Sequence, residues 1–427
     1  MNKKEGSLLD RVLSDYGKRS YFPKGVVMQS QQAGKEAFFV NATAGVALEK
    51  NHYVTHPQFN HVLQTLSGDQ IVSYAPTSGD PVLRALWKQE MVKKNPLVHI
   101  NEISDPIITT GLTHALYIAS QLFVNPGDTI FIPSPCWDNY ELIFHTHSQA
   151  NVEYVPLFDT SYRWNTDNFS KALHTHTHKK MVVLLNFPHN PTGYSPTESE
   201  LKELVNLCIQ EAERGKDIVV IIDDAYAGLY HTEDAYPYSP FGLLAHAHEN
   251  IVAIKCDAAT KEALVWGFRV GFITYGSKTF TSKEYDMLDE KTKAVIRSSI
   301  SSSSRVSQSL LIEVMKEPSF SDTVERVKQM MRDRFLLVQD VLHRYKNHRL
   351  LHPYPSNSGY FCTFHTAGDA HQLREYLLKT HGLGVVALSP HLIRFAYSAV
   401  DEQLIERSLL IMYESSEFLW QDIIASL

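Results

Sequence analysis

Four side chains with complementary chemistry lie within residues 218–269. Two short apolar runs rich in β-branched residues, IVVIID and IVAIKCD, occur there. Asp223 and Tyr226 follow the first run, and Lys261 and Arg269 follow the second. Such runs are typical of strands buried on both faces of a parallel sheet, and ligands bind beyond the carboxyl ends of those strands. We therefore expect a carboxylate, a phenol, an amine and a guanidinium to lie together at one edge of a sheet.

The chemistry open to this group centres on the amine of Lys261. Most lysines are solvated surface groups, but one that is buried near other cations can react as a neutral amine and form a Schiff base. Asp223 could keep a pyridinium nitrogen protonated, although a helix cap or a salt bridge explains that carboxylate alone equally well. Tyr226 could donate to the ring's phenolic oxygen, and the rigid fork of Arg269 matches phosphate oxygens. The four residues together suggest a pyridoxal phosphate site.

Other polar and aromatic residues follow further strand-like runs. The segment 110–113 (TGLT) marks a strand that turns into a helix, whose free amides would bind an anion, although a glycine at such a turn is common. Trp137 offers a flat face for stacking on a ring, but a buried tryptophan is usually part of a core. Asn190 lies between prolines in a tight turn, where asparagine also occurs for backbone reasons. Arg394, in an apolar strand, needs a carboxylate partner that is either internal or part of a substrate.

The elements that must position these residues alternate between strand and helix. With 427 residues the chain is too long for one ordinary core. Strand, polar loop and helix alternate through its middle, which predicts an α/β fold with a mostly parallel, doubly wound sheet. Beyond about residue 310 the pattern changes to long charged helices and shorter strands. We predict an N-terminal arm that is part of a small domain (1–58), a large cofactor-binding domain (59–310) and a C-terminal small α+β domain (311–427).

The bulk composition is that of a globular protein without a dedicated nucleic-acid surface. Hydrophobic residues make up 44% of the chain, charged residues 20%, and the formal charge is −7. The four cysteines are far apart and form no CxxC pair, which favours a reducing compartment. The sequence shows no signal-peptide h-region and no apolar run of about 20 residues. We therefore expect a cytoplasmic protein that binds neither nucleic acid nor membrane.

Histidines at alternate positions form the remaining candidate cluster. His174, His176 and His178 would share one face of an extended segment, which leaves incidental metal binding as an alternative. No further ligand motif accompanies them, so we interpret them as surface histidines and predict no metal site. The sequence also contains no P-loop, no GxGxxG and no GxSxG motif.

Taken in order, the motifs of this chain resemble those of the class I/II aminotransferases, pyridoxal phosphate enzymes of the aspartate aminotransferase type (fold type I). The resemblance spans roughly residues 45–397. The ordered motifs are YxPxxG at 74–79, TG at 110–111, WxNY at 137–140, NPTG at 190–193, DxAY at 223–226, K-x7-R at 261–269 and RF at 394–395. Each motif is common by itself, but the complete set in this order is specific.

The resemblance implies a role for each residue around the cofactor ring. Lys261 would be the internal aldimine lysine and would shuttle a proton between the substrate's α-carbon and the cofactor. Asp223 would pair with the pyridine nitrogen. Asn190 and Tyr226 would hydrogen-bond the ring oxygen O3′, and Trp137 would stack on the ring.

The resemblance also implies which residues bind the phosphate and the substrate. The phosphate ligands would be Gly111, Leu112, Thr113 and Arg269. Tyr74 would reach the phosphate of a neighbouring subunit, which implies a homodimer with shared active sites. Arg394 would bind the substrate's α-carboxylate, with Asn190 beside it, and Gly45 would lie over the substrate.

Two positions depart from the family pattern. In many members a serine stands three residues before the lysine, and this serine binds the phosphate. Here that position is Ala258. Thr260 or Thr110 would have to supply the missing hydroxyl. Many members also carry a proline where this chain has Trp266. These departures concern cofactor affinity and subfamily rather than the core chemistry.

The function implied by the resemblance is an aminotransferase that moves an amino group between an L-amino acid and a 2-oxo acid. The acceptor would be 2-oxoglutarate, and the mechanism a ping-pong sequence through aldimine and ketimine. Because the fold supports several reactions, a C–S lyase or a decarboxylase with the same cofactor is the alternative. A non-enzymatic regulator that senses pyridoxal phosphate is a remote alternative, since about 40 residues precede the first family-like segment near Gly45 and no basic recognition helix is evident.

The sequence leaves the amino donor open. A dicarboxylate donor needs a second cation, and the basic residues in the right region are Lys291, Lys293, Arg297 and Arg305. Aromatic residues could instead line the side-chain pocket, and the candidates are Tyr140, Tyr360 and Trp266.

Overall fold

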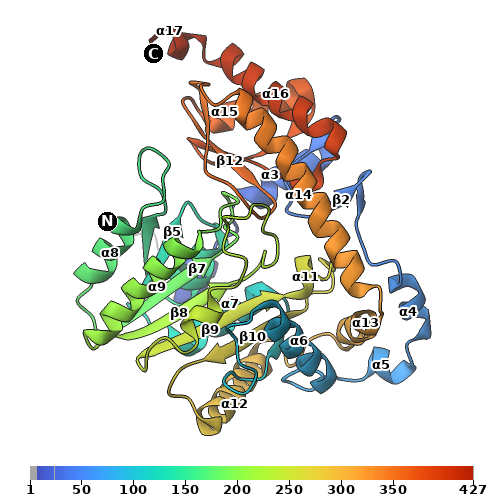
Figure 1. Ribbon diagram of the computed structural model, residues 1–427, viewed down its shortest axis with the longest axis vertical. Helices are drawn as coiled ribbons and strands as arrows, with labels where there is room; N and C mark the ends of the chain where they lie inside the picture. The colour runs from blue at the N-terminus through green and yellow to red at the C-terminus, as the bar shows by residue number, and fades with distance from the viewer. Residues whose placement is uncertain (1–6, 24, 427) are drawn as a thin grey trace.

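A seven-stranded sheet forms the centre of the larger part of the molecule in the computed structural model, which describes residues 7–23 and 25–426 (Figure 1). Its strands are β4 (Ile107–Thr109), β5 (Thr129–Ser134), β6 (Asn151–Pro156), β7 (Lys180–Asn186), β8 (Asp217–Asp223), β9 (Ile251–Ala258) and β10 (Gly271–Gly276). Their order is β4-β10-β9-β8-β7-β5-β6. From β9 to β6 neighbouring strands are parallel, and β10 is antiparallel to both of its neighbours. The predicted mostly parallel α/β sheet is confirmed.

Helices cover both faces of this sheet. They include α6 (Pro81–Lys94), α7 (Leu112–Phe123), α8 (Thr166–Thr175), α9 (Glu198–Glu213), α10 (Phe241–Leu244), α11 (Ala259–Glu262) and α12 (Ser282–Ser299), together with the π-helix η1 (Glu141–His147). A capping box begins α9, because the Thr197 and Glu200 side chains each accept from the other residue's backbone N–H.

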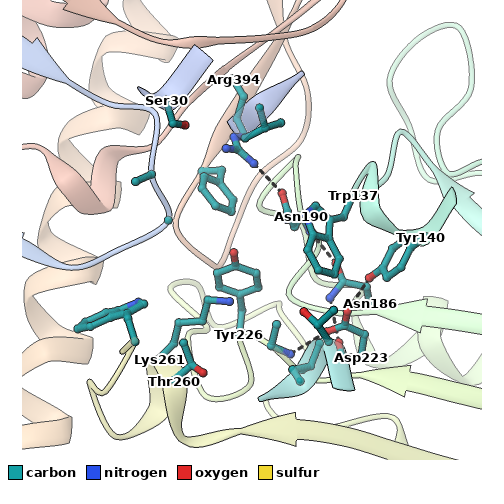
Figure 2. Close-up of a pocket in the computed structure, with 18 of the residues that line it drawn as sticks. Ser30, Trp137, Tyr140, Asn186, Asn190, Asp223, Tyr226, Thr260, Lys261 and Arg394 are labelled. Carbon is teal, nitrogen blue, oxygen red and sulfur yellow. Dashed lines mark hydrogen bonds between the residues drawn. The ribbon is translucent and has the colours of Figure 1, made fainter. Parts of the chain in front are cut away.

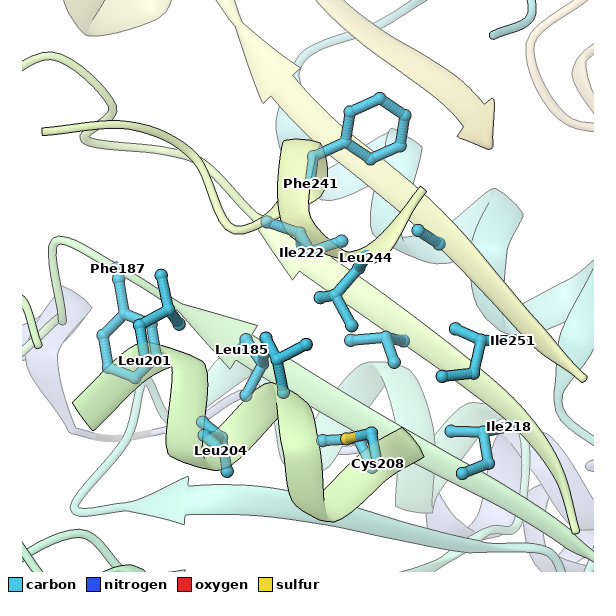
Figure 3. Close-up of a cluster of buried hydrophobic side chains, with 14 of the residues drawn as sticks. Leu185, Phe187, Leu201, Leu204, Cys208, Ile218, Ile222, Phe241, Leu244 and Ile251 are labelled. Carbon is cyan, nitrogen blue, oxygen red and sulfur yellow. The ribbon is translucent and has the colours of Figure 1, made fainter. Parts of the chain in front are cut away.

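The strands are apolar throughout because each face packs against its own helices. Along β7, Val183 and Leu185 belong to the cluster that contains α9, whereas Val182 and Leu184 belong to the cluster that contains α7. Figure 3 shows the first cluster, with Leu201, Leu204 and Cys208 of α9 facing the sheet. Burial on two sides explains the continuous apolar runs in the sequence.

A second, smaller sheet lies beside the C-terminal helices (Figure 1). It is antiparallel, in the order β11-β12-β15-β14, and consists of β11 (Leu351–Pro353), β12 (Cys362–Thr366), β14 (Val386–Ser389) and β15 (Leu392–Phe395). The helices of this region are α14 (Phe320–Arg344), α15 (Ala370–His381), η2 (Tyr397–Ala399), α16 (Glu402–Leu419) and α17 (Gln421–Ser426). Helix α13 (Arg305–Lys316) packs instead with α6 and the β4/β10 edge of the large sheet.

The N-terminal segment joins this smaller region. β1 (Val40–Asn41) pairs in parallel with β13 (Leu383–Gly384), and Val40 and Ala42 belong to the C-terminal core. The other N-terminal elements are α1 (Leu8–Val12), α2 (Asp15–Arg19), α3 (Val26–Glu36), β2 (Leu48–Glu49), β3 (His52–Tyr53), α4 (Phe59–Thr65) and α5 (Gly68–Val72). Residues 1–6 of the predicted arm lie outside the described part, and the domain boundaries after residues 58 and 310 stay a prediction. No helix among the described residues is long and apolar enough to cross a membrane.

Replacement of Leu204 by alanine tests the packing of α9 on the sheet. Leu204 is fully buried between α9 and the strands, so Leu204→Ala removes apolar contacts and leaves a cavity. We expect a loss of about 3 kcal/mol in the free energy of unfolding, measured by urea denaturation. The control is Leu63→Ala on α4, where half of the side chain is exposed and the loss is expected to be small. Equal losses for the two variants would contradict the packing.

Candidate functional site

A cavity of about 290 Å³ lies beyond the carboxyl ends of β8 and β9 (Figure 2). It brings together most of the residues singled out from the sequence. Those that line it are Gly45, Leu112, Thr113, Trp137, Asn190, Asp223, Tyr226, Thr260, Lys261, Arg269 and Arg394. Parallel strands deliver their carboxyl ends to one edge of a sheet, which is why residues far apart in sequence meet there.

Asp223 is the last residue of β8 and is almost completely buried. Its Oδ2 accepts a hydrogen bond of 2.7 Å from the Tyr140 hydroxyl, and its Oδ1 accepts one of 3.0 Å from the backbone N–H of Ala225. Burial raises the pKa of Asp223 to about 6, while these two donors and the charge of Lys261 act to lower it. Asp223 is therefore predominantly ionised at neutral pH and is held in a fixed orientation.

Lys261 reaches the same cavity from α11, the short helix that directly follows β9. Its Nζ lies 4.1 Å from the centroid of the Tyr226 ring (Figure 2). Desolvation lowers the pKa of Lys261 to about 8, the charge of Asp223 opposes that effect, and Arg269 and Arg394 add to it. An appreciable share of the amine is therefore neutral near pH 7, as a nucleophile or a proton acceptor requires.

Arg394 enters the cavity from β15 of the smaller sheet. Its Nη1 donates to Oδ1 of Asn190 and its Nη2 to the carbonyl oxygen of Thr43, each at 3.0 Å (Figure 2). Its guanidinium lies 4.2 Å from the centroid of the Phe361 ring, and its buried Nε has no hydrogen-bond partner. These contacts with neutral groups fix the guanidinium without neutralising its charge, so a carboxylate is the ligand that it fits.

One corner of the cavity combines the N-terminus of α7 with the guanidinium of Arg269. Gly111, with φ of 77°, begins α7, whose first residues line the cavity. A Cβ on Gly111 would lie 2.5 Å from Nη2 of Arg269, and one on Gly271 would lie 2.5 Å from the carbonyl carbon of Gly111. The two glycines therefore allow the helix amides and Arg269 to meet, and together these donors form an anion site that suits a phosphate.

Some predicted residues lie outside the cavity lining. Thr110 adjoins this corner, where its backbone N–H donates to Nδ1 of His114. Tyr74 is 94% exposed and faces solvent in the single chain. Ala258 is buried at the end of β9, and as the residue that begins α11 it provides no side-chain cap.

The candidates for side-chain recognition separate into two groups. The basic residues of α12 and α13 do not line the cavity: Lys293 pairs with Asp289, and Arg305 pairs with Asp80. Of the aromatic candidates, Tyr140 and Trp266 line it. Tyr360 packs behind the wall, with its ring centroid 5.5 Å from that of Tyr226.

Several lining residues had not been predicted. Asn186 is the last residue of β7, and its side chain donates to the backbone oxygen of Asp223. Like Asp223, it is a polar residue at the carboxyl end of a buried strand, so the same reasoning could have found it. Tyr140 was named only as an aromatic candidate for the side-chain pocket, and nothing local indicates its hydrogen bond to Asp223. The others are Val26, Ser30, Thr43, Ala44, Ala225 and Phe361. Most of these come from segments whose position depends on tertiary packing.

Proteins similar to this chain in sequence include aminotransferases. A probable aspartate/prephenate aminotransferase of Aquifex aeolicus is 25% identical over 345 residues, which cover 78% of this chain and 81% of that protein. An aspartate aminotransferase of Musicola paradisiaca is 30% identical over 202 residues, which cover 47% of each chain.

Solved structures show the same fold over nearly the whole chain. An aminotransferase from Anaerococcus prevotii superposes with a TM-score of 0.83 at 21% identity, covering 95% of this chain and 98% of that one. A kynurenine aminotransferase from Pyrococcus horikoshii, solved in complex with PMP, has a TM-score of 0.78 at 16% identity and covers 97% and 99%. The family model described as aminotransferase class I and II matches residues 44–409. The chain therefore belongs to the class I/II aminotransferases, which are pyridoxal phosphate enzymes.

Proposed function

We propose that this aminotransferase moves the amino group of an L-amino acid to 2-oxoglutarate in two alternating half-reactions. The observation that carries the proposal is the convergence of Lys261, Asp223 and Arg394 in one cavity. An amine of lowered pKa, a buried carboxylate and a guanidinium that forms no ion pair among the described residues are the groups that amino-acid chemistry on a pyridine cofactor needs.

The residues of the cavity fit pyridoxal phosphate. Asp223 would pair with the pyridine nitrogen, Tyr226 and Asn190 with the ring oxygen, and Trp137 would stack on the ring. The residues that would hold the phosphate are Gly111, Leu112, Thr113 and Arg269, with Thr110 or Thr260 replacing the hydroxyl that Ala258 lacks. The tight fit at Gly111 supports this placement, because a Cβ there would close the space between α7 and Arg269. The bound cofactor supplies an aldehyde that condenses with amines and a ring that withdraws electrons.

The protein's own groups would then bind, orient and move protons. Arg394 would hold the α-carboxylate, with Asn190 fixing the guanidinium and Gly45 leaving room above it. A Cβ on Gly45 would meet the Phe361 ring at 2.7 Å, which shows how closely the backbone approaches this wall. Lys261 Nζ would accept the proton from the substrate's α-carbon and deliver it again. The charge of Asp223 would keep the ring protonated through the cycle.

The wider setting of the protein also belongs to the proposal. We place it in the cytoplasm as a homodimer, with large and small domains divided near residues 58 and 310. The four cysteines are free thiols, which agrees with a reducing compartment. The exposure of Tyr74 leaves its hydroxyl available to the phosphate site of a second copy.

Replacement of Lys261 tests the central assignment. Lys261→Ala removes the only proton carrier that the proposal names, so we expect turnover to fall by at least about a thousandfold. Steady-state rates with an amino acid and 2-oxoglutarate, and the absorbance of the bound cofactor, provide the measurement. Lys278→Ala, at an exposed position after β10, is the matched control and should behave as wild type. A Lys261→Ala enzyme with a near wild-type rate would show that another residue does this work.

Replacement of Tyr140 tests the support of the buried carboxylate. Tyr140→Phe removes one hydrogen bond to Asp223, so the pKa of Asp223 should rise. Asp223 then becomes protonated at higher pH, and the acid limb of kcat/KM should move upward by about one pH unit, since such a bond to a charged group is worth about 1.5–3 kcal/mol. A pH profile of kcat/KM measures the change. An unchanged acid limb would show that this limb does not report the ionisation of Asp223.

An acceptor assay separates aminotransferase from lyase chemistry. With a panel of L-amino acids and 2-oxoglutarate, we expect glutamate to form in amounts equal to the 2-oxo acid released from the donor. Without an acceptor, the reaction should stop after one turnover per site, because the amino group stays on the enzyme. Continued release of ammonia and pyruvate without an acceptor would instead identify a lyase.

A further inference from the structure

Helix α3 forms one side of the cavity, and the proposed reaction gives it no role. Val26 and Ser30, which stand four residues apart on one face of the helix, both line the cavity. Figure 2 shows Ser30 and Arg394 on the upper side of the cavity, with Lys261 and Asp223 on the lower side. Helix α3 therefore borders the part of the cavity that Arg394 enters.

The other face of α3 is fixed to the smaller sheet by Gln29. Its Nε2 donates to the backbone oxygen of Ala387, and its Oε1 accepts from the backbone N–H of the same residue, each at 2.8 Å. Ala387 belongs to β14, which is an edge strand of that sheet. The buried carboxamide of Gln29 thus pairs with the free edge as a peptide group of a further strand would.

Two further contacts hold α3 against the same region. A Cβ on Gly384 in β13 would lie 2.7 Å from Cβ of Ala33, so the helix packs closely on that strand. The side chain of Gln32 accepts a hydrogen bond of 2.6 Å from Nη2 of Arg374 on α15. Helix α3 is therefore a firmly docked part of the smaller region and presents a defined surface to the cavity.

Mostly small side chains line the cavity on this side. The lining residues of the N-terminal segment are Val26, Ser30, Thr43, Ala44 and Gly45. The backbone oxygen of Thr43 accepts a hydrogen bond from Arg394, so this segment adjoins the guanidinium. The side chain of an amino acid branches from the carbon atom next to its carboxylate. A substrate whose carboxylate is held by Arg394 would therefore place its side chain near this segment.

We propose that Val26 and Ser30 form one wall of the pocket for the substrate's side chain, and that Ser30 limits the size of the side chain that fits. Gln29 is the positioning residue that holds this wall. This role rests on the proposed function, which assigns the α-carboxylate to Arg394. It adds the residues that distinguish between substrates sharing that carboxylate.

Two unreactive carboxylates separate the α-carboxylate site from the side-chain pocket. Acetate and hexanoate lack an amino group and cannot condense with the cofactor's aldehyde, so titration calorimetry of the holoenzyme measures their binding without turnover. Acetate fills only the site at Arg394, whereas the chain of hexanoate also reaches the wall. Both should bind to the wild-type holoenzyme. If neither binds, the assignment of Arg394 in the proposed function is wrong, and the role of α3 is overturned with it.

Replacement of Ser30 tests the wall. Ser30→Leu places a larger side chain in the pocket, so we expect at least about a tenfold loss of hexanoate affinity and less than about a twofold change for acetate. The matched control is Gln31→Leu, which adds the same side chain at the neighbouring exposed position of α3 and should bind both as wild type. Unchanged hexanoate affinity, or an equal loss for the two carboxylates, would overturn the proposal and leave the assignment of Arg394 intact.

A milder variant applies if Ser30→Leu does not fold. Ser30→Thr adds one methyl group and should weaken hexanoate binding at least about twofold, again without a matching change for acetate. Hexanoate binding by Ser30→Thr equal to that of the wild type would overturn the proposal in this case.

Replacement of Gln29 tests the positioning of the wall. Gln29→Leu keeps a similar volume but removes both hydrogen bonds to Ala387, so α3 loses its anchor on β14. We expect hexanoate to bind at least about threefold more weakly, with acetate within about twofold of wild type. A general structural disturbance would instead weaken both carboxylates alike. A folded Gln29→Leu protein, judged by circular dichroism, with unchanged hexanoate affinity would overturn the positioning role.

Discussion

The carboxylate of Asp223 is a charge held almost out of contact with water, and the electrostatics of the cavity depend on how it is stabilised. Burial by itself raises its pKa, whereas Tyr140, the Ala225 amide and the charge of Lys261 favour the ionised form. Asp223 in turn raises the pKa of Lys261 against desolvation and against the repulsion from Arg269 and Arg394. The amine of Lys261 is therefore partly protonated and partly neutral near pH 7. The charge of each of these two groups shifts the pKa of the other.

The large sheet carries two charge clusters, one on each side of its β8 edge. Asp223 and Asp224 are successive residues, and the alternation of side chains along a strand directs them to opposite faces. Asp223 lines the cavity, while Asp224 pairs with Lys255 on the other side. On the helix α11, where successive side chains point in different directions around the axis, Lys261 lines the cavity and Glu262 pairs with Lys94 instead. Charged residues that are adjacent in the sequence therefore lie in different electrostatic environments.

The sequence predicted the features that follow from local pattern. The apolar runs of β7, β8 and β9, the glycine turn before α7 and the polar residues after each strand were all recognisable, because burial on two faces and strand-end chemistry leave a local signature. The direction of β10 was not, since its run GFITYG is equally apolar whether the strand is parallel or antiparallel. Nor was the bond between Tyr140 and Asp223, which are 83 residues apart and meet only through the fold.

The arrangement of cations bears on which amino donors the single chain can recognise. Among the described residues, the lysine and arginine side chains that line the cavity are Lys261, Arg269 and Arg394. In the proposed assignment the amine chemistry, the phosphate and the α-carboxylate occupy all three. A second substrate carboxylate would then find no further cation in the described lining, because none of the basic candidates from α12 and α13 reaches the cavity. Trp137, Trp266 and Phe361 line the same space, so an apolar or aromatic side chain finds contacts within the described chain, whereas an acidic one finds no free cation there.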